Sequence, residues 1–250
     1  MSLSVRGLAA RQLADYRARM PGTFFGEEDH PRLTLDDAYA VQAEVATLRV
    51  ADGEPVAGYK VGATGPGTRE QFGMDGPVRG FVYGTELYPS GATLSHASYA
   101  NLAIEGELAV RLGDAAEIVR VFPVIELHNY VFRSETPALQ ELIANNGLHA
   151  GVVLPDGDGT EWRGEEPLAG TLRVEINGRT VAEGAMSGVP GGPAGSVEWL
   201  RRNLEAHGLA LRPRQLVLTG TPLGLYPVRP GDAVRVTAER LGAVEATVAP

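Results

Sequence analysis

The chain of 250 residues contains no cysteine, which excludes disulfide bonds, thiolate metal sites and a cysteine nucleophile. Basic residues are also few, since 22 Lys and Arg face 31 Asp and Glu and leave a net charge of −9. This balance argues against a general affinity for nucleic acid or an anionic membrane surface. No hydrophobic run approaches the ~18 residues of a membrane span, and no signal peptide is visible. We therefore expect an acidic cytoplasmic protein without nucleic-acid or membrane partners.

Lysine is nearly absent, because Lys60 is the only lysine beside 21 arginines. A drift in composition that replaces lysine by arginine would spare a lysine where an amine must lose its proton, which arginine cannot do near neutral pH. Chance would leave the same pattern, so the count alone leaves both readings open. The setting favours a function, since Lys60 lies on a short predicted strand between Gly58 and Gly62.

The chain does contain enough hydrophobic residues, 44% of the total, to build a sizeable core. Helices are predicted first, over residues 3–18 and 34–50, from their apolar spacing. From about residue 56 the pattern changes to short β-rich runs between Gly and Pro turns. The sequence therefore predicts an α+β fold with a helical N-terminal arm over residues 1–55 and one β-rich catalytic domain over residues 56–250.

Several helix ends and turns carry local signals. Thr34 with Asp37 predicts a capped start for the second helix. Thr136 before Pro137 predicts the start of a short helix that runs to Ala144. The remaining predictions are a β-hairpin with a type I′ turn at Asn177-Gly178, a helix from Ser196 to Gly208, and strands over residues 215–218, 233–237 and 244–248.

Two acids share one face of a predicted strand in the segment 104–110, Ile-Glu-Gly-Glu-Leu-Ala-Val. Side chains alternate along a strand, so Glu105 and Glu107 lie on one face and Ile104 and Leu108 on the other. Two neighbouring carboxylates repel each other unless a cation or a proton lies between them. Oxygen ligands favour a hard ion, Mg²⁺ or Mn²⁺, over zinc. A solvated face of an antiparallel sheet is the simpler alternative for such a pair.

A second apolar strand, residues 121–127, carries the acid Glu126, followed two residues later by His128. Taken alone, Glu126 is equally well explained as a surface residue of an edge strand. Together with Glu105 and Glu107 it supplies the third carboxylate of an Mg²⁺ site that leaves coordination positions for water and substrate oxygens. The five histidines are scattered along the chain, and we expect most of them to be surface or core residues.

Two further segments offer groups that would bind substrate. Lys60 beside a carboxylate site would hold an anionic substrate or transfer protons, and Asp75 ends the loop that follows it. The segment 218–224 leaves a strand into a turn whose backbone N–H groups and hydroxyls, on Thr219 and Thr221, would face an oxyanion. An ordinary loop with structural glycines explains this segment equally well. Phosphate-binding glycine motifs and the GxSxG and HExxH signatures are absent.

Taken together and in order, five segments resemble the fumarylacetoacetate hydrolase superfamily. They are 58–62 (Gly-Tyr-Lys-Val-Gly), 71–75 (Gln-Phe-Gly-Met-Asp), 104–107 (Ile-Glu-Gly-Glu), 123–127 (Pro-Val-Ile-Glu-Leu) and 219–222 (Thr-Gly-Thr-Pro). The helical arm and the length are most similar to the branch of 2-oxo-4-pentenoate hydratases and 4-oxalocrotonate decarboxylases. The resemblance runs from about residue 34 to the C-terminus.

This resemblance implies a mixed β-roll of the fumarylacetoacetate hydrolase C-terminal type, an Mg²⁺ or Mn²⁺ ion, and a 2-oxo acid chelated through its carboxylate and keto oxygens. Carried over by position, the metal ligands of the family fall on Glu105, Glu107 and Glu126. The active-site lysine falls on Lys60, and an acid that takes part in proton transfer falls on Asp75.

Two positions depart from the hydratase pattern. The branch usually has an aspartate where this chain has Asn129, and an Asp-Asn pair where it has Asn145 and Asn146. Each change removes a carboxylate, so proton transfer through those acids is not implied here. The Thr-Gly-Thr-Pro segment is closer to hydrolase and decarboxylase members, so the resemblance implies the superfamily more firmly than the reaction.

The function expected is a metal-dependent lyase, either a hydratase or a decarboxylase, for a small 2-oxo or 2-hydroxydienoic acid, as in aromatic-degradation meta-cleavage pathways. The ion would polarise the 2-oxo group and stabilise an enolate, while Lys60 and Asp75 move protons. The alternatives are an acylpyruvate-type C–C hydrolase, for which an obvious Glu-His pair is lacking, and a catalytically altered relative that binds a 2-oxo acid. We also expect a homo-oligomer, or an assembly with a related pathway enzyme, because Leu8, Leu13 and Tyr16 of the arm need a covering surface.

Overall fold

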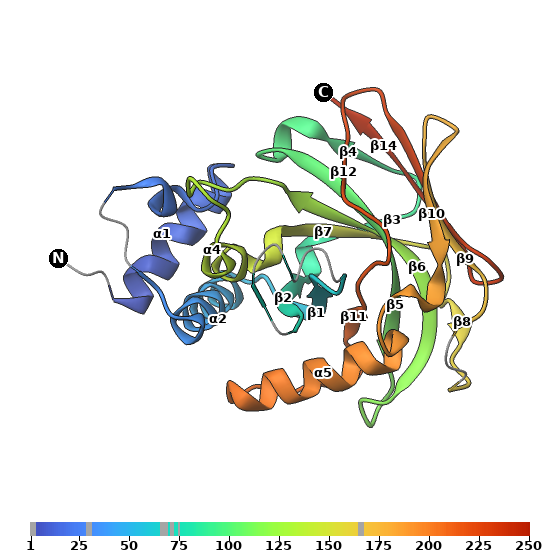
Figure 1. The fold of residues 1–250 in the computed structure, drawn as a ribbon, viewed down its shortest axis with the longest axis horizontal. Coiled ribbons are helices and arrows are strands. Elements are labelled where there is room, and N and C mark those ends of the chain that lie inside the picture. The colour runs from blue at the N-terminus through green and yellow to red at the C-terminus, as the bar shows by residue number, and fades with distance from the viewer. Residues whose placement is uncertain (1–3, 29–31, 66–69, 71–72, 75, 165–167) are drawn as a thin grey trace.

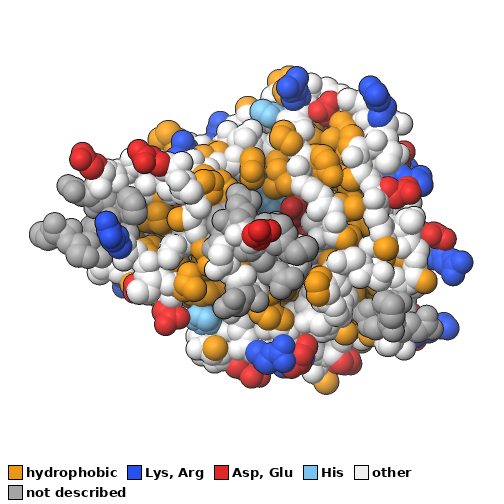
Figure 2. Space-filling view, in the orientation of Figure 1, with side chains coloured by type: hydrophobic (Ala, Val, Ile, Leu, Met, Phe, Trp, Pro, Cys, Tyr) orange, Lys and Arg blue, Asp and Glu red, His pale blue; other side chains and the backbone are white. Residues whose placement is uncertain are grey.

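The computed structural model describes residues 4–28, 32–65, 70, 73–74, 76–164 and 168–250. The N-terminal helices lie at one end of the molecule and β-sheets form most of the rest (Figure 1). In the same orientation, hydrophobic side chains gather in the middle of the visible face, whereas charged ones lie mostly along its outline (Figure 2). The arrangement confirms the predicted α+β class with a helical N-terminal region. No described helix is long and apolar enough to cross a membrane.

The helical arm consists of α1 (Val5–Arg17) and α2 (Leu35–Ala51), with a 3₁₀ turn at Thr23–Gly26 between them. The predicted cap of α2 is confirmed. The Thr34 hydroxyl accepts a hydrogen bond from the backbone N–H of Asp37, and the Asp37 carboxylate accepts one from the backbone N–H of Thr34.

The larger sheet has nine strands, of which seven follow the order β2-β1-β11-β5-β6-β7-β3. A long antiparallel pair, β5 and β6, forms its middle, and β1 runs parallel to β11. The strands are β1 (Val56–Gly62), β2 (Val78–Tyr83), β3 (Leu87–Pro89), β5 (Leu102–Leu112), β6 (Ile118–Asn129), β7 (His149–Leu154), β8 (Thr160–Glu161), β11 (Leu216–Leu218) and β12 (Tyr226–Pro227).

The smaller sheet has the order β10-β9-β13-β14-β4. Its strands are β4 (Ala92–Ser95), β9 (Thr171–Ile176), β10 (Arg179–Ala185), β13 (Ala233–Ala238) and β14 (Gly242–Ala249). The predicted hairpin is confirmed by β9 and β10, because Asn177 and Gly178 have φ angles of 54° and 72°, as a type I′ turn requires. The last three predicted strands are also confirmed, as β11, β13 and β14.

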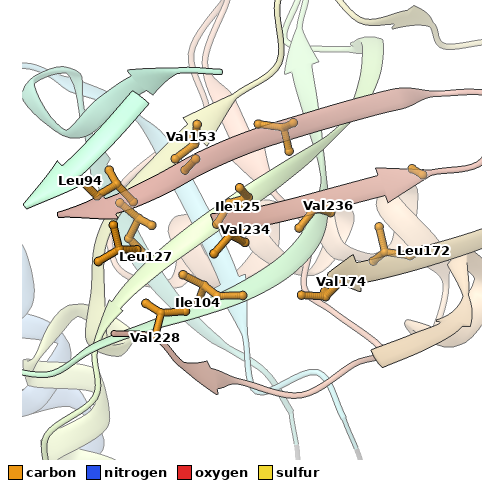
Figure 3. Packing of buried hydrophobic residues seen from close by; sticks show 14 of the residues in the cluster. Leu94, Ile104, Ile125, Leu127, Val153, Leu172, Val174, Val228, Val234 and Val236 are labelled. Atoms are coloured by element: carbon orange, nitrogen blue, oxygen red, sulfur yellow. The ribbon is translucent and has the colours of Figure 1, made fainter. Parts of the chain in front are cut away.

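The main hydrophobic core lies between the two sheets (Figure 3). Ile104 and Ile125 of the larger sheet pack in it with Val234 of the smaller one. Gly106 lies at a close approach of the sheets, since a Cβ there would be 2.5 Å from Cγ2 of Val174. The glycine between the two acids of β5 is therefore required by the packing, and the acids point away from this core.

The helix α4 (Leu139–Ala144) begins later than predicted, with Ala138 rather than Thr136 as its N-cap. The buried carboxylate of Glu141 explains the difference. It accepts hydrogen bonds from the backbone N–H groups of Arg133 and Ser134, so the chain before the helix folds back on it.

The helix α5 (Gly192–Ala206) begins four residues before the predicted Ser196. Pro193 lies in its first turn, where the missing N–H of proline would have no helical partner. The Gly- and Pro-rich segment before Ser196 therefore contains the start of the helix instead of a loop alone.

The arm packs against its own chain. Leu8 and Leu13 are 2% and 6% exposed, and the hydroxyl of Tyr16 donates a hydrogen bond to Glu86 at 2.6 Å. Leu8 shares a buried cluster with Ile143 of α4. The arm therefore gives no argument for a neighbouring subunit, and the homo-oligomer stays a prediction from the resemblance.

Candidate active site

The acidic face of β5 and β6 points away from the core between the sheets. Strand pairing sets Glu105 directly opposite Glu126, with Glu107 two residues farther along β5. Opposite residues of an antiparallel pair share a face, so the three carboxylates lie on one side of the sheet. Lys60 joins them from β1, and its Nζ lies 3.3 Å from Oε1 of Glu126.

These charged side chains are largely removed from solvent. Glu107 and Glu126 are fully buried and Lys60 is 3% exposed, while the Glu105 side chain keeps 18% of its surface accessible. A solvated strand face therefore does not describe Glu107. Buried charges need partners of opposite charge, so the contacts within this group determine how the charges are stabilised.

Lys60 is the counter-charge to the acids. Burial alone would lower the pKa of its ammonium group, but the charges of Glu126, Glu105 and Glu107 outweigh burial and raise it. Burial would likewise raise the pKa of Glu126, but the charges of Lys60 and His128 hold it well below its usual value. Lys60 and Glu126 therefore form a buried ion pair.

Glu107 differs from Glu126 in the direction of its pKa shift. Burial, with the charges of Glu126 and Glu105, raises its pKa well above the usual value. Its Oε2 accepts a hydrogen bond from the backbone N–H of Gly220 at 3.1 Å, while its Oε1 has no hydrogen-bond partner in the described part of the chain. A cation beside this carboxyl would take the place of the proton.

Two histidines that the sequence did not single out also lie here. His149 Nδ1 is 2.7 Å from Glu126 Oε1, and His128 Nε2 is 3.3 Å from an oxygen of Glu105 and 3.4 Å from one of Glu126. Burial would lower the pKa of His128, but the charges of Glu126 and Glu105 raise it to about 9. The spacing contained a signal for His128, because residues two apart on a strand share a face. His149 is brought in only by the pairing of β7 with β6.

The residues fit a divalent cation. One potential ligand atom each from Glu105, Glu126 and His128 lie within 4.8 Å of one another. Oε2 of Glu126 and Oε1 of Glu107 are buried without a hydrogen-bond partner among the described residues, although such atoms normally have one. Carboxylate oxygens are the ligands that Mg²⁺ and Mn²⁺ prefer. The donor set therefore fits the predicted ions.

The turn after β11 holds β5 in place. The hydroxyls of Thr219 and Thr221 donate to backbone carbonyls of β5 at 2.7 and 2.6 Å, and Gly220 donates to Glu107. Thr221 lines the cavity beside the acids, whereas Thr219 is buried and is not brought to the described cavity wall.

A cavity of about 220 Å³ opens beside the acids. Lys60, Glu105, Glu107 and His128 line its polar part. The larger apolar side chains of its described wall are Tyr130, Phe132, Leu142, Leu148, Leu223 and Leu225. Asp75, the acid predicted to transfer protons, lies outside the described residues.

The asparagines at the two departing positions are used in structural hydrogen bonds. Asn129 accepts one from the backbone N–H of Ala100 at 2.8 Å, and Asn145 accepts one from the side chain of Gln12. Neither asparagine belongs to the described cavity lining. The presence of asparagine instead of aspartate at these two positions therefore removes no carboxylate from the described cavity lining.

Comparison with known proteins supports the resemblance. Residues 144–249 match the family model of the fumarylacetoacetate (FAA) hydrolase C-terminal region. The chain is 28% identical over 229 residues to a 2-hydroxyhexa-2,4-dienoate hydratase of Comamonas testosteroni, with 86% of each chain covered. Its fold matches 4-oxalocrotonate decarboxylase from Pseudomonas putida G7 complexed with calcium and acetate, with a TM-score of 0.86 and 26% identity over 99% of each chain.

A second structure of that decarboxylase, complexed with magnesium and adipate, matches with the same TM-score of 0.86 at 25% identity over 99% of each chain. The mixed β-roll with a helical arm is therefore confirmed over nearly the whole length. The family model, the relatives and the fold therefore agree that this chain is similar to proteins of the fumarylacetoacetate hydrolase superfamily, among them hydratases and 4-oxalocrotonate decarboxylases.

Proposed function

We propose that the protein is a divalent-metal-dependent lyase that hydrates a small 2-hydroxydienoic acid. The observation that carries the proposal is the largely buried group of Glu105, Glu107 and Glu126, which meets Lys60 at the edge of a cavity. The reaction class is supported by relatives, because a hydratase and a decarboxylase are both lyases.

Glu105, Glu107 and Glu126 would hold the ion, Mg²⁺ or Mn²⁺. When bound, the ion supplies a Lewis acid that polarises the 2-oxo group of the substrate. The chain orients these carboxylates by further contacts. The backbone N–H of Gly220 donates to Glu107, and His149 contacts Glu126 at 2.7 Å.

Lys60 is the proposed proton carrier. Hydration adds a proton to one carbon and a hydroxyl group to another, so a group that releases and recovers a proton must lie next to the substrate. An amine serves this purpose, whereas a guanidinium with a pKa above ~12 stays protonated. Asp75 is proposed as a second proton carrier on the strength of the resemblance. Thr221 is proposed to contact the substrate from the turn after β11, whereas Thr219, predicted as a second contact, instead supports this turn through its hydrogen bond to β5.

The cavity wall favours hydration of a monocarboxylic acid over decarboxylation of a dicarboxylic one. Lys60 is the only lysine or arginine in the described lining, and it is already paired with Glu126. A second carboxylate at the far end of a substrate would meet no further lysine or arginine of the described lining, and a buried carboxylate without such a partner is unfavourable. An apolar tail would instead be buried against Tyr130, Phe132 and Leu223.

Incubation with Mg²⁺ and a panel of 2-hydroxydienoates tests the proposal through the ultraviolet absorbance of the dienol. We expect decay that requires both the metal and Lys60, fastest with monocarboxylic substrates, and a product heavier by one water. Release of CO₂ from a dicarboxylic substrate would identify a decarboxylase, and cleavage of an acylpyruvate a hydrolase. A silent panel with retained metal binding would identify a protein that only binds a 2-oxo acid.

A further inference from the structure

His128 is a buried side chain whose ring nitrogens make no hydrogen bond of ordinary geometry with the described residues. It is 3% exposed, and both ring nitrogens lack a hydrogen-bond partner among the described residues. A buried polar group without a partner is unfavourable, and such groups are rare in folded proteins. The ring lines the cavity beside the acids, so a group bound in the cavity can reach it.

The distances around Nε2 of His128 are those of neighbouring metal ligands. Nε2 lies 3.3 Å from Oε2 of Glu105 and 3.4 Å from Oε2 of Glu126. A charged hydrogen bond between these groups would measure about 2.7–2.9 Å. Two ligand atoms that each lie about 2.1 Å from one ion, at an angle of about 90–110°, are about 3.0–3.4 Å apart.

The contacts of Glu126 leave one oxygen free on the side of His128. Its Oε1 lies 2.7 Å from His149 Nδ1 and 3.3 Å from Lys60 Nζ. Its Oε2 has no hydrogen-bond partner in the described chain, and Nε2 of His128 is close to it. The two ends of the carboxylate therefore have different surroundings, with the unsatisfied oxygen beside the unsatisfied nitrogen.

We propose that His128 is a nitrogen ligand of the divalent ion beside Glu105 and Glu126, and that the site therefore selects first-row transition ions over Mg²⁺. Mg²⁺ favours oxygen ligands, whereas imidazole binds transition ions more strongly, with affinity rising from Mn²⁺ to Co²⁺. The inference rests on the metal site of the proposed function. It is independent of which reaction that site performs.

Pulsed electron paramagnetic resonance on the full chain loaded with Mn²⁺ detects the ligand directly. We expect modulation from a coupled ¹⁴N nucleus in the wild type, its loss in His128→Leu, and its persistence in His149→Gln. The second variant is the matched control, since His149 contacts the same carboxylate. Wild-type protein labelled with ¹⁵N-histidine provides a second test that does not depend on the folding of His128→Leu. If a histidine binds the ion, the ¹⁴N coupling of the unlabelled protein should be replaced by a ¹⁵N coupling in the labelled protein.

Titration calorimetry measures the selectivity. The ratio of Co²⁺ to Mg²⁺ affinity should fall at least tenfold in His128→Leu and stay within about twofold in His149→Gln. Bound Mn²⁺ without nitrogen coupling, or coupling that survives in His128→Leu, would overturn the ligand assignment and leave the carboxylate site standing. A wild type that binds no divalent ion would overturn the proposed function together with it.

Discussion

Lys60 Nζ lies 3.3 Å from Oε1 of Glu126, and two glycines make room for the lysine. A Cβ at Gly62 would lie 2.6 Å from Nζ, and one at Gly147 would lie 2.7 Å from Cε. A guanidinium is wider than an ammonium group, so arginine would not fit between these backbones without shifting them. The close approach of Gly62 and Gly147 therefore favours a lysine over an arginine at this position on grounds of size.

We predict that Lys60→Arg and Lys60→Met both lower turnover by roughly 10²-fold or more, as expected for a lost general acid–base group. Metal binding should survive in both variants. Dienol absorbance measures the turnover and calorimetry measures the metal affinity. Should the arginine variant keep most of its turnover, Lys60 would be an anchor for the substrate carboxylate and Asp75 the leading proton carrier.

Chemical rescue separates proton transfer by Lys60 from its charge. We expect small primary alkylamines to restore part of the turnover of Lys60→Ala, at a rate that depends on the pKa of the amine. Guanidinium carries the same positive charge but stays protonated near neutral pH. It should therefore not restore the turnover of Lys60→Ala. Equal rescue by both would contradict proton transfer.

Glu107→Gln is predicted to lower the affinity for Mg²⁺ or Mn²⁺ by at least tenfold, or ~1.4 kcal/mol, because it removes a charged ligand. Glutamine can still accept the hydrogen bond from Gly220, so the backbone around the site should stay in place. Titration calorimetry is the measurement. Glu161→Gln, at an exposed acid of the same sheet, is the control and should leave the affinity unchanged. Equal affinity in both variants would exclude Glu107 as a ligand.

The sequence was informative about the acids because the alternation of side chains along a strand is a local property. Glu105 and Glu107 could be assigned to one face from two residues of spacing, and the strand pairing then confirmed that face. Their burial could not be derived, because it depends on what covers the sheet. His149 was missed for the same reason, since only the irregular register between β6 and β7 brings it to Glu126.

The turn after β11 shows a second limit of sequence reasoning. Hydroxyls and N–H groups in a glycine turn were expected to face a ligand, but those of Thr219 and Gly220 are used to hold β5 and Glu107. Local composition shows which donors a turn can offer. Which acceptors meet them depends on the crossing of strands far apart in the sequence, here β11 and β5.

Arg49 of α2 is predicted to be essential for joining the arm to the sheets. Its Nη2 lies 2.7 Å from Oε1 of Glu86, and its guanidinium lies 3.6 Å from the ring centre of Tyr83. Both partners of the ion pair are buried, so Arg49→Met should lower the free energy of unfolding by about 3–5 kcal/mol. Arg173→Met breaks an exposed pair with Glu183 and should leave the free energy of unfolding nearly unchanged. Urea denaturation measures both, and equal losses would contradict the role of burial.

The last prediction concerns Gly106, which lies between the two acids of β5. In Gly106→Ala the new methyl group would lie 2.5 Å from Cγ2 of Val174 and 3.1 Å from Cγ2 of Val236. Overpacking of this kind lowers stability by about 1–3 kcal/mol. Because the strand that must shift carries Glu105 and Glu107, we expect the metal affinity to fall as well. Gly65→Ala, where a Cβ would meet no atom of the described residues within 4 Å, is the control for stability.

A double-mutant cycle shows whether the steric contact is the cause. Val174→Ala alone leaves a small cavity and should lower stability. Combined with Gly106→Ala it provides space for the new methyl group, so the double variant should lose less than the sum of the two single losses. Metal affinity should recover in parallel, because β5 returns to its place. Additive losses would mean that Gly106 is needed for its backbone rather than for the close approach of the two sheets, and the coupling of sheet packing to the acidic site would be rejected.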